Sequence, residues 1–487
     1  MYNRDSPMGL SPSGTVPTIP MKDIFKAYDI RGIYPSEINS SAALRIGEGL
    51  VRFLRKTKKG KPSTRAKLGA GLAPHRNEVS GAGLKIVVGR DNRLSSPVLG
   101  RAVKKGILEE GADVIDIGLS STPMFYFAVW KYNYDGGIMV TASHNPPEYN
   151  GFKIVREKAD AIGEESGLRE IKKLTLQKRK EDKIKKGVVK NKNILKSYLD
   201  FSSPRLIFLM PDLKRLRIAI DTANAVSGIL IKELKKRLPC KIYHLFPELD
   251  GRFPNHLVDP LEEKNIKDLK NFVKEKKLDL GIAFDGDGDR IIFVDEKGEM
   301  IPSDFITCLI SQRILRQKPG TKILYNICSS NIIKDVVEES GGIAMAGKIG
   351  HTFIEERMKK EKVFFSGEFS GHYFLSPYFF EVPLFVLFKV LEEISQSGKT
   401  ISQLVRPFQK YFHSGQINMK VEDKKKKLKE LEEKFKGGKI SHLDGLRIDF
   451  KNWWFNARPS NTEDLLRIVV EARTKKLMEE KKKEISF

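Results

Sequence analysis

Cysteine is scarce in this chain of 487 residues, which contains three: Cys240, Cys308 and Cys328. They are widely spaced and lie in apolar or strand-like stretches, which favours buried reduced thiols over a disulfide framework or a zinc site. Long apolar runs are also missing, because none approaches the roughly 20 residues that a membrane-spanning helix needs. Residues 1–20 lack the basic and apolar regions of a secretory signal. We therefore expect a cytoplasmic protein with no membrane partner.

Acidic residues are fewer than basic ones, with 62 Asp and Glu against 87 Lys and Arg and a formal net charge of +25. The excess is dispersed, and its densest runs, at 178–186, 424–429 and 475–483, are interrupted by Leu, Ile or Glu, as on the solvated faces of amphipathic helices. We expect no nucleic-acid partner, although a basic nucleic-acid-binding protein stays open as a third hypothesis. A lysine-rich proteome or a preference for anionic substrates would produce the same charge.

The composition is that of a soluble globular protein, with 40% hydrophobic and 31% charged residues. At roughly 150 residues per domain, the length suggests three or four domains. Apolar strand-like segments alternate with helical ones in three successive regions, which predicts an α/β fold of three similar βα mixed-sheet domains. A smaller α+β domain follows at the C-terminal end. We expect a flexible extension at 1–20, with Met21 as an alternative start, and domains at 21–200, 201–298, 299–412 and 413–487.

Several local patterns make this division specific. Segment 56–83 is basic and rich in Gly, Pro and Ser, which predicts a long surface loop. Segment 157–196 is highly charged and predicts a helical bridge to the second domain. In the last domain, we expect short strands at 417–421, 446–450 and 466–471 around a helix at 424–435. The strands expected in the three βα domains are 85–89, 113–118, 137–140, 217–221, 278–285, 291–294, 322–327 and 363–366.

A serine-containing turn follows one of these strands. Residues 141–146 read Thr-Ala-Ser-His-Asn-Pro, directly after the apolar run 137–140. Ser143 therefore lies just past the C-terminal end of a buried strand, where α/β sheets place their ligands. The alternative is an ordinary polar turn in which His144 is structural, and these six residues alone leave both interpretations open.

A second stretch places three carboxylates after an apolar strand. Asp285, Asp287 and Asp289 alternate with glycines, and Arg290 follows. The glycines let the backbone wrap a small ion, and three hard oxygens suit Mg²⁺. A calcium loop would continue to Glu296 at its twelfth position, but 291–294 has the pattern of a strand. An acidic surface turn is less favourable, because carboxylates packed this closely repel one another without a cation.

Two further loops have the residue types that bind sugar phosphates. Glu368 and Ser370 lie in a glycine-lined loop after a strand, and both can accept hydrogen bonds from sugar hydroxyls. His351 begins a predicted helix, where it could titrate near neutrality or be purely structural. The fourth stretch could bind a phosphate dianion or cap a helix, and it contains Arg458, Ser460, Asn461 and Thr462.

Together, the four stretches resemble the α-D-phosphohexomutase family, in its phosphomannomutase/phosphoglucomutase branch, and the resemblance covers residues 25–472. It implies four domains around a central active-site cleft, which carry in chain order the phosphoserine, the metal, the sugar site and a phosphate site. The further stretches that match are Tyr28-Asp29-Ile30-Arg31-Gly32, Gly89-Arg90-Asp91-Asn92-Arg93, Glu148-Tyr149-Asn150-Gly151-Phe152-Lys153 and Asp250-Gly251-Arg252-Phe253-Pro254-Asn255-His256.

The activity implied by the resemblance is that of an isomerase, an intramolecular phosphotransferase. It would interconvert hexose 6-phosphate and hexose 1-phosphate, of mannose and/or glucose, through a hexose 1,6-bisphosphate that also serves as activator. Ser143 would be a phosphoserine and the phosphoryl donor. Mg²⁺ would be held by that phosphoserine together with Asp285, Asp287 and Asp289.

The resemblance also implies roles for the remaining residues. Arg290 would steady the phosphoryl group, and Arg31 and Lys153 would line the same site. Either Lys153 or His351 would act as general acid/base. The residues expected to bind substrate, of which the last four would clamp the distal phosphate, are Tyr28, Glu368, Ser370, Arg458, Ser460, Asn461 and Thr462.

The chain departs from the family pattern at 375–383, which reads Leu-Ser-Pro-Tyr-Phe-Phe-Glu-Val-Pro where a basic residue and an Asp-Asp-Gly run are usual. The following helix can still start, because Pro suits a first helical turn. A phosphoglucosamine mutase is an alternative within the family, but Phe369 stands where Gln is typical of that enzyme. From another class, a catalytically weak sugar-phosphate binding protein is the alternative. Gly288 replaces a common Ala, and Asp464 a common Pro. The sequence gives no oligomeric state.

Overall fold

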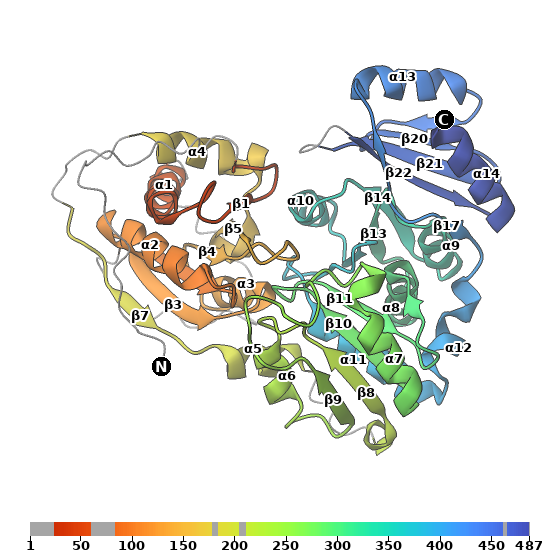
Figure 1. Ribbon diagram of the computed structural model, residues 1–487, viewed down its shortest axis with the longest axis horizontal. Helices are drawn as coiled ribbons and strands as arrows, with labels where there is room; N and C mark the ends of the chain where they lie inside the picture. The colour runs from red at the N-terminus through yellow and green to blue at the C-terminus, as the bar shows by residue number, and fades with distance from the viewer. Residues whose placement is uncertain (1–23, 60–82, 178–183, 204–210, 461–464, 487) are drawn as a thin grey trace.

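The computed structural model describes residues 24–59, 83–177, 184–203, 211–460 and 465–486. Within them the chain forms four sheets, one after another along the sequence (Figure 1). We call the parts built on these sheets the first, second, third and fourth unit. The fold class expected from the sequence, three α/β units with a smaller last one, is confirmed. The expected extension at 1–20 lies outside the described residues.

The first unit has a seven-stranded mixed sheet. Parallel strands β3 and β4 flank β2, and β5 runs antiparallel between β4 and β1. The strands in sheet order are β1 (Ile30–Ile33), β5 (Tyr149–Arg156), β4 (Gly136–Val140), β2 (Lys85–Arg90), β3 (Asp113–Leu119) and β7 (Val189–Asn191), with β6 (Asp160–Ala161) beside β5. The helices of this unit are α1 (Ser40–Lys59), α2 (Ser96–Glu109), α3 (Thr122–Lys131), α4 (Arg169–Leu176) and α5 (Leu195–Ser202).

Two expectations for this unit are corrected by the structure. The loop predicted over 56–83 starts later, because α1 continues to its end at Lys59, and 60–82 lie outside the described residues. The segment 157–196 is broken rather than one helical bridge. Gly167 has a φ of 145°, which no helix interior adopts, and Val189 pairs with Val114 as β7 adds to the sheet. Val188 and Val189 are β-branched and favour a strand, but the many charged residues around them led to the prediction of a helix.

The second unit has a five-stranded sheet in which β10 lies between parallel β8 and antiparallel β11. The loop 285–290 joins β10 to β11, so the acidic stretch lies at one edge of the sheet. The strands in sheet order are β12 (Met300–Ile301), β11 (Ile291–Val294), β10 (Leu280–Phe284), β8 (Arg217–Asp221) and β9 (Lys241–Leu245). The helices are α6 (Gly228–Leu234) and α7 (Lys267–Lys276).

The third unit repeats this plan with four strands, and β13 lies between parallel β14 and β15. Helix α11 starts at Pro383, in its first turn, as the sequence predicts. The strands in sheet order are β14 (Ile343–Gly347), β13 (Lys322–Asn326), β15 (Phe365–Gly367) and β16 (Tyr373–Leu375). The helices are α8 (Ser303–Gln317), α9 (Asn331–Glu339), α10 (His351–Glu361), α11 (Pro383–Ser397) and α12 (Ile401–Val405).

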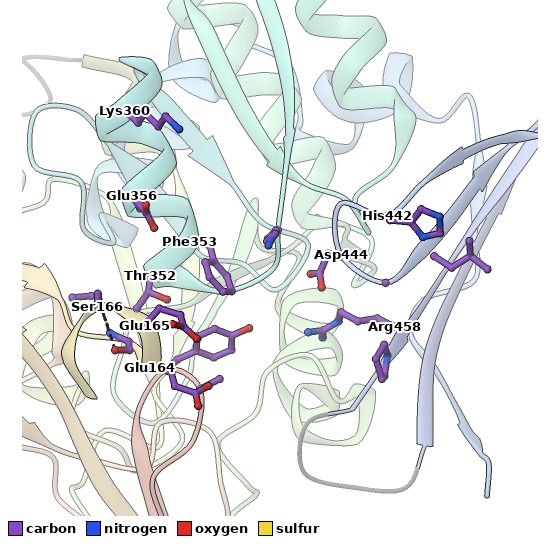
Figure 2. Close-up of a pocket in the computed structure, with 18 of the residues that line it drawn as sticks. Glu164, Glu165, Ser166, Thr352, Phe353, Glu356, Lys360, His442, Asp444 and Arg458 are labelled. Carbon is purple, nitrogen blue, oxygen red and sulfur yellow. Dashed lines mark hydrogen bonds between the residues drawn. The ribbon is translucent and has the colours of Figure 1, made fainter. Parts of the chain in front are cut away.

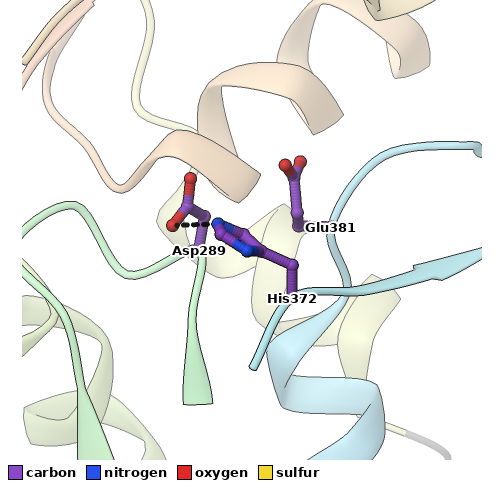
Figure 3. A group of neighbouring side chains, drawn as sticks. All are labelled: Asp289, His372 and Glu381. Carbon is purple, nitrogen blue, oxygen red and sulfur yellow. Dashed lines mark ion pairs between the residues drawn. The ribbon is translucent and has the colours of Figure 1, made fainter. Parts of the chain in front are cut away.

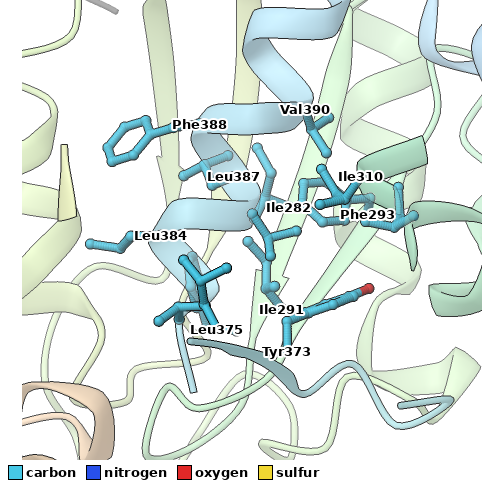
Figure 4. Packing of buried hydrophobic residues seen from close by; sticks show 14 of the residues in the cluster. Ile282, Ile291, Phe293, Ile310, Tyr373, Leu375, Leu384, Leu387, Phe388 and Val390 are labelled. Atoms are coloured by element: carbon cyan, nitrogen blue, oxygen red, sulfur yellow. The ribbon is translucent and has the colours of Figure 1, made fainter. Parts of the chain in front are cut away.

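The second and third units share one hydrophobic core. Figure 4 shows Ile282 and Phe293 of the second sheet packed with Ile310 of α8 and Leu387 of α11. All four side chains are at most 1% exposed. Burial of apolar surface favours the assembled pair by about 25 cal/mol per Å². The loops at the edges of the two sheets are therefore held in fixed relation to each other.

The fourth unit is an antiparallel sheet with two helices, one between strands β18 and β19 and one after the last strand. The sequence predicts such an α+β domain. The prediction missed β21, because its sequence, Trp-Trp-Phe-Asn-Ala-Arg-Pro, contains the first part of the expected phosphate loop. The strands are β17 (Phe412–His413), β22 (Leu465–Ala472), β21 (Trp453–Pro459), β20 (Leu446–Asp449) and β19 (Lys439–Ser441), with β18 (Ile417–Lys420) beside β22. The helices are α13 (Lys424–Lys434) and α14 (Lys475–Ser486).

Short helical turns complete the fold. None of the helices in the described part of the chain combines the length and the apolar character needed to cross a membrane. All three cysteines are buried and free, as expected. The short turns are η1 (Glu157–Ala159), the π-turn η2 (Glu164–Leu168), η4 (Pro211–Arg215), η5 (Glu263–Asn265) and η6 (Arg406–Phe408).

A buried glutamate lies where α10 of the third unit meets the first unit. The Oε2 atom of Glu355 accepts hydrogen bonds from the backbone N–H of Ala161 at 3.2 Å and from Lys359 Nζ at 3.5 Å. The side chain is 2% exposed, and burial raises its pKa from 4.5 to about 8 against the opposing effect of Lys359. The contact between the two units therefore holds a carboxyl group that is protonated at neutral pH.

This glutamate predicts a pH-dependent stability. The unfolded chain loses the proton near pH 4.5 and the folded chain near pH 8, so the folded state binds more protons in this window and its stability falls as pH rises. We expect Glu355→Gln to raise the melting temperature by about 2 °C or more at pH 8.5 and to leave it unchanged at pH 4.5. Thermal unfolding at both pH values measures this. An equal shift at both values would contradict the assigned protonation.

Candidate active site

Ser143 lies in the turn after β4, and its side chain points to the second unit. Its Oγ donates a hydrogen bond to Asp285 Oδ2 at 3.0 Å and lies 3.2 Å from His144 Nδ1. The residue is 3% exposed and has a φ of 50°, in the left-handed region that non-glycine residues rarely adopt. The ordinary polar turn does not account for a strained, buried serine that contacts a carboxylate of another unit.

The backbone around Ser143 is held by a buried arginine, which lies in one of the matching stretches but for which the sequence predicted no role. Arg93, which is 1% exposed, contacts three carbonyl oxygens of the turn and a fourth at the start of β5. Its Nε donates to Asp91 Oδ2 at 3.2 Å, which keeps the guanidinium in place. A planar fork with five N–H donors suits this set of acceptors, and a lysine could not reproduce it. The carbonyl acceptors are those of Ser143 at 2.8 Å, Asn145 at 2.6 Å, Pro146 at 2.5 Å and Tyr149 at 3.1 Å.

The acidic loop lies directly against this turn. A Cβ atom at Gly286 would approach the carbonyl oxygen of Ser143 to 2.3 Å, so only glycine allows the two backbones to come this close. Asp285, Asp287 and Asp289 are at most 1% exposed, and one oxygen of each lies within 4.8 Å of the others. Among the described residues, Asp287 Oδ1 has no hydrogen-bond partner. Converging carboxylates with an unsatisfied buried oxygen fit a hard divalent cation such as Mg²⁺.

Two cationic side chains balance these carboxylates. Lys153 on β5 donates to Asp287 Oδ2 at 2.7 Å and also bonds Asp289. Burial alone would lower the pKa of Lys153, but the two aspartates raise it above the ordinary lysine range, so the ammonium stays charged. Arg290 donates its backbone N–H to Asp285 at 3.2 Å and pairs its side chain with Asp259 at 3.4 Å. The site therefore contains cations from the first and second units.

The expected sugar loop of the third unit lies against the acidic loop of the second unit. Ser370 Oγ lies 2.7 Å from His372 Nδ1, and His372 Nε2 lies 3.3 Å from Asp289 Oδ1. Glu368 is 3% exposed and accepts a hydrogen bond from Asn326 at 3.4 Å. His372 belongs to the glycine-lined stretch that the sequence identified, but its link to the acidic loop had no signal in the sequence.

The segment that departs from the family pattern adds a carboxyl group to the site. Figure 3 shows Glu381 beside Asp289 and His372, and one ligand atom of each lies within 4.8 Å of the others. Glu381 is 1% exposed, and its Oε2 has no hydrogen-bond partner among the described residues. Burial and the negative charge of Asp289 raise the pKa of Glu381 well above its usual range. The altered segment thus keeps an acidic residue next to the sugar loop.

Two of the other predicted residues, Tyr28 and Arg458, line an adjoining cavity of about 880 Å³ between the first, third and fourth units. Figure 2 shows Arg458 on its fourth-unit side and Phe353 of α10 opposite. Tyr28 also lines the cavity and donates its hydroxyl to the carbonyl of Ile349 at 3.2 Å. Among the described residues, Arg458 Nε is buried without a hydrogen-bond partner, which leaves a donor for an anion.

His351 and Arg31 are not among the residues that line this cavity. His351 is the first residue of α10, and its ring lies 6.1 Å from that of Tyr28. Burial and the charge of Lys153 lower the pKa of His351 to about 4, so its ring is neutral at pH 7. Arg31 donates to Asn145 Oδ1 at 2.7 Å, next to the Ser143 turn.

The expected phosphate clamp connects two strands. Arg458 and Pro459 end β21, and their backbone pairs with β22, which begins at Leu465. The described elements on both sides of the stretch are therefore strands, which disfavours the helix-cap interpretation. Ser460 is 4% exposed and follows β21 directly. Asn461 and Thr462 lie outside the described residues.

Fold and site together define a class: a four-unit α/β protein in which a buried serine, an acidic loop and a polar loop converge from three units. Sequence profiles identify the family within this class. Those of phosphoglucomutase/phosphomannomutase α/β/α domains I, II and III and of the C-terminal domain match residues 57–182, 196–298, 302–411 and 417–486. The chain belongs to the phosphoglucomutase/phosphomannomutase family. The exact domain boundaries expected from the sequence stay predictions.

Comparison with individual relatives agrees with the family assignment. The chain is 37% identical to a phosphomannomutase of Methanocaldococcus jannaschii over 95% of its own length and 96% of that protein. A crystal structure of a phosphoglucomutase/phosphomannomutase family protein from Burkholderia thailandensis has a TM-score of 0.81 at 29% identity and covers 94% of this chain and 95% of that one. The protein is therefore a hexose phosphate mutase, an isomerase.

A more distant structure shares the fold. The N-acetylphosphoglucosamine mutase of Aspergillus fumigatus, solved with GlcNAc-6P and magnesium, has a TM-score of 0.59 at 13% identity. It covers 95% of this chain and 94% of its own. At this identity the likeness shows the common architecture.

The cradle formed by Arg93 predicts a large effect of a conservative change. Lysine keeps the charge but replaces the five donors with three that share one atom, so at least two charge-assisted hydrogen bonds are lost. We expect Arg93→Lys to lower the free energy of unfolding by about 3 kcal/mol. Urea unfolding followed by tryptophan fluorescence measures it. Arg101→Lys, at an exposed position of the same region, is the matched control and should have no effect; equal effects of both changes would contradict the prediction.

Proposed function

We propose that the protein interconverts hexose 6-phosphate and hexose 1-phosphate, of mannose and/or glucose, through a phosphoserine at Ser143. The observation that supports this most directly is the contact of Ser143 Oγ with Asp285 Oδ2 at 3.0 Å, inside a buried acidic loop. A serine used only for structure would have no reason to lie in left-handed backbone against three carboxylates. The phosphoryl group would pass from Ser143 Oγ to the free hydroxyl of the sugar phosphate, and the hydroxyl proton would go to a base.

The acidic loop is the proposed Mg²⁺ site. Asp285, Asp287 and Asp289 would hold the ion together with the phosphoserine, and the unsatisfied Asp287 Oδ1 supports this assignment. A bound Mg²⁺ supplies Lewis-acid stabilisation of charge on phosphoryl oxygens. The phosphoserine would add about −1.5 to −2 charge to the site, so Arg290 and Lys153 are needed as cations beside it.

General acid/base catalysis is proposed for either Lys153 or His351. The ammonium of Lys153 lies between Asp287 and Asp289 and carries a proton that it could give. His351 is neutral at pH 7 because burial lowers its pKa to about 4, so it can accept one. Arg31, next to the Ser143 turn, would hold a phosphoryl oxygen.

The substrate would lie between the sugar loop and the phosphate clamp. Glu368 and Ser370 would bind hydroxyls of the hexose, and Tyr28 would line its path through the cavity. Because the clamp would recognise either phosphate of the bisphosphate, the intermediate can turn and return its other phosphoryl group to Ser143. The residues of the proposed clamp are Arg458, Ser460, Asn461 and Thr462.

Phe369 supports a neutral hexose over an amino sugar. Its ring stacks on His413 at 5.1 Å, so the side chain offers no hydrogen bond at the position where an amide is typical of phosphoglucosamine mutases. Hexose 1,6-bisphosphate is the proposed activator, since it restores a phosphoserine that is lost to water. A cytoplasmic location and the lack of a nucleic-acid partner stay predictions from the sequence.

The mechanism predicts a complete dependence on Ser143. In a coupled assay with mannose 1-phosphate or glucose 1-phosphate, Mg²⁺ and a catalytic amount of hexose bisphosphate, we expect turnover with the native protein and a loss of at least about 10³-fold in Ser143→Ala, because no group remains to carry the phosphoryl. Circular dichroism checks that the variant folds. No turnover of either sugar by the native protein would support the sugar-phosphate binding protein instead, and undiminished turnover in Ser143→Ala would reject the phosphoserine.

The metal assignment makes a separate prediction. Chelation with EDTA should abolish turnover, and Mg²⁺ should restore it. Removal of one ligand in Asp287→Asn should raise the Mg²⁺ concentration needed for half-maximal rate by about 10-fold or more. Turnover that persists without a divalent ion would reject the metal assignment while leaving the serine assignment untouched.

A further inference from the structure

Helix α3 of the first unit begins against the acidic loop of the second unit. Thr122, its first residue, is 0% exposed. Its Oγ1 donates to Asp287 Oδ2 at 2.6 Å, and its backbone N–H donates to the carbonyl oxygen of Asp287 at 2.8 Å. The same aspartate is therefore fixed at its side chain and at its backbone by one residue of the neighbouring unit.

The two oxygens of Asp287 have different surroundings. Oδ2 accepts from Thr122 at 2.6 Å and from Lys153 at 2.7 Å. Oδ1 is buried and has no hydrogen-bond partner among the described residues. Two donors on one oxygen fix the rotation of the carboxylate, and the other oxygen stays available as a single ligand atom. Hydrogen bonds of this kind orient metal ligands in general and raise their affinity.

We propose that Thr122 is a positioning residue for the metal site, which holds Asp287 with Oδ1 towards the cation. This inference rests on the proposed Mg²⁺ site and extends it to a residue in another unit. Thr122 does not touch the ion in this arrangement, and its effect passes through Asp287. It ties metal binding to the contact between the first and second units.

The surroundings leave Thr122 free for this task. The N-cap of α3 is provided by Ser121, whose side chain accepts the N–H of Met124 at 3.4 Å, so the Thr122 hydroxyl is not used in capping. The loop after Asp287 is also fixed, because a Cβ atom at Gly288 would lie 2.3 Å from Ser227 Oγ and 3.3 Å from Ser121 Cβ. Asp287 therefore cannot move with its loop to regain a lost hydrogen bond.

The test compares variants that differ in the hydroxyl. Thr122→Val keeps the shape and removes the donor, Thr122→Ser keeps the donor, and Thr122→Ala removes the donor without adding a methyl group should valine fail to fold. The dissociation constant of Mn²⁺ is measured by electron paramagnetic resonance of the free ion, with every protein dephosphorylated and checked by intact mass. This readout does not depend on turnover.

We expect Thr122→Val to raise the Mn²⁺ dissociation constant by about 10-fold, and Thr122→Ser to stay within about 3-fold of the native protein. Thr175→Val is the matched control, because Thr175 is also buried, at 1% exposed, but lies in α4 of the same unit away from the acidic loop. It should bind Mn²⁺ like the native protein. The Mn²⁺-dependent rise in melting temperature should be smaller in Thr122→Val than in the native protein. It should be unchanged in Thr122→Ser and in Thr175→Val.

Asp287→Asn separates the two ways in which the inference could fail. If this change weakens Mn²⁺ binding and Thr122→Val does not, the metal site stands and the role of Thr122 is rejected. If Asp287→Asn leaves Mn²⁺ binding unchanged, the metal assignment itself is rejected. Equal losses in Thr122→Val and Thr122→Ser, or a loss in Thr175→Val, would attribute the effect to packing and overturn the proposal.

Discussion

Three buried carboxylates in a single loop are stable only when cations and donors from elsewhere in the chain face them. The cost of burying an isolated charge is so high that an unpaired carboxylate takes up a proton instead. Here Lys153 from the first unit and Arg290 from the loop itself supply the positive charge, and His372 reaches Asp289 from the third unit. The acidic loop is thus the place at which the first, second and third units must come into contact.

Partners from elsewhere in the chain also explain why Ser143 can stay in a strained backbone conformation. A non-glycine residue with a φ of 50° persists only where its surroundings determine it, and Arg93 fixes three carbonyls of the turn. Asp91 keeps that guanidinium charged and oriented. The serine hydroxyl is therefore already in position before substrate binds. The conformational entropy of ordering it is lost when the protein folds, not when substrate binds.

The sequence predicted those parts of the molecule that depend on local pattern. The strands at 217–221 and 291–294 have their expected bounds, because short apolar runs bounded by turns are strong signals. The acidic loop and the serine turn were found because each follows such a strand. The roles of Arg93 and Thr122 could not be found in this way, since their contacts join residues 50 and 165 positions apart. Only the packing of the sheets brings these partners together.

The lining of the cavity is consistent with an intermediate that has to turn. A snug apolar pocket would hold a sugar bisphosphate in one orientation, whereas a cavity of about 880 Å³ with acidic and basic walls offers alternative partners for its hydroxyls. Glu164 and Glu356 lie across this space from Arg458. If each hydrogen bond to the proposed intermediate can be exchanged for another or for water, the barrier to its rotation would be low. The contacts that must not exchange would then be those at the ends, at the proposed phosphate clamp and at the Ser143 turn, whose backbone Arg93 fixes.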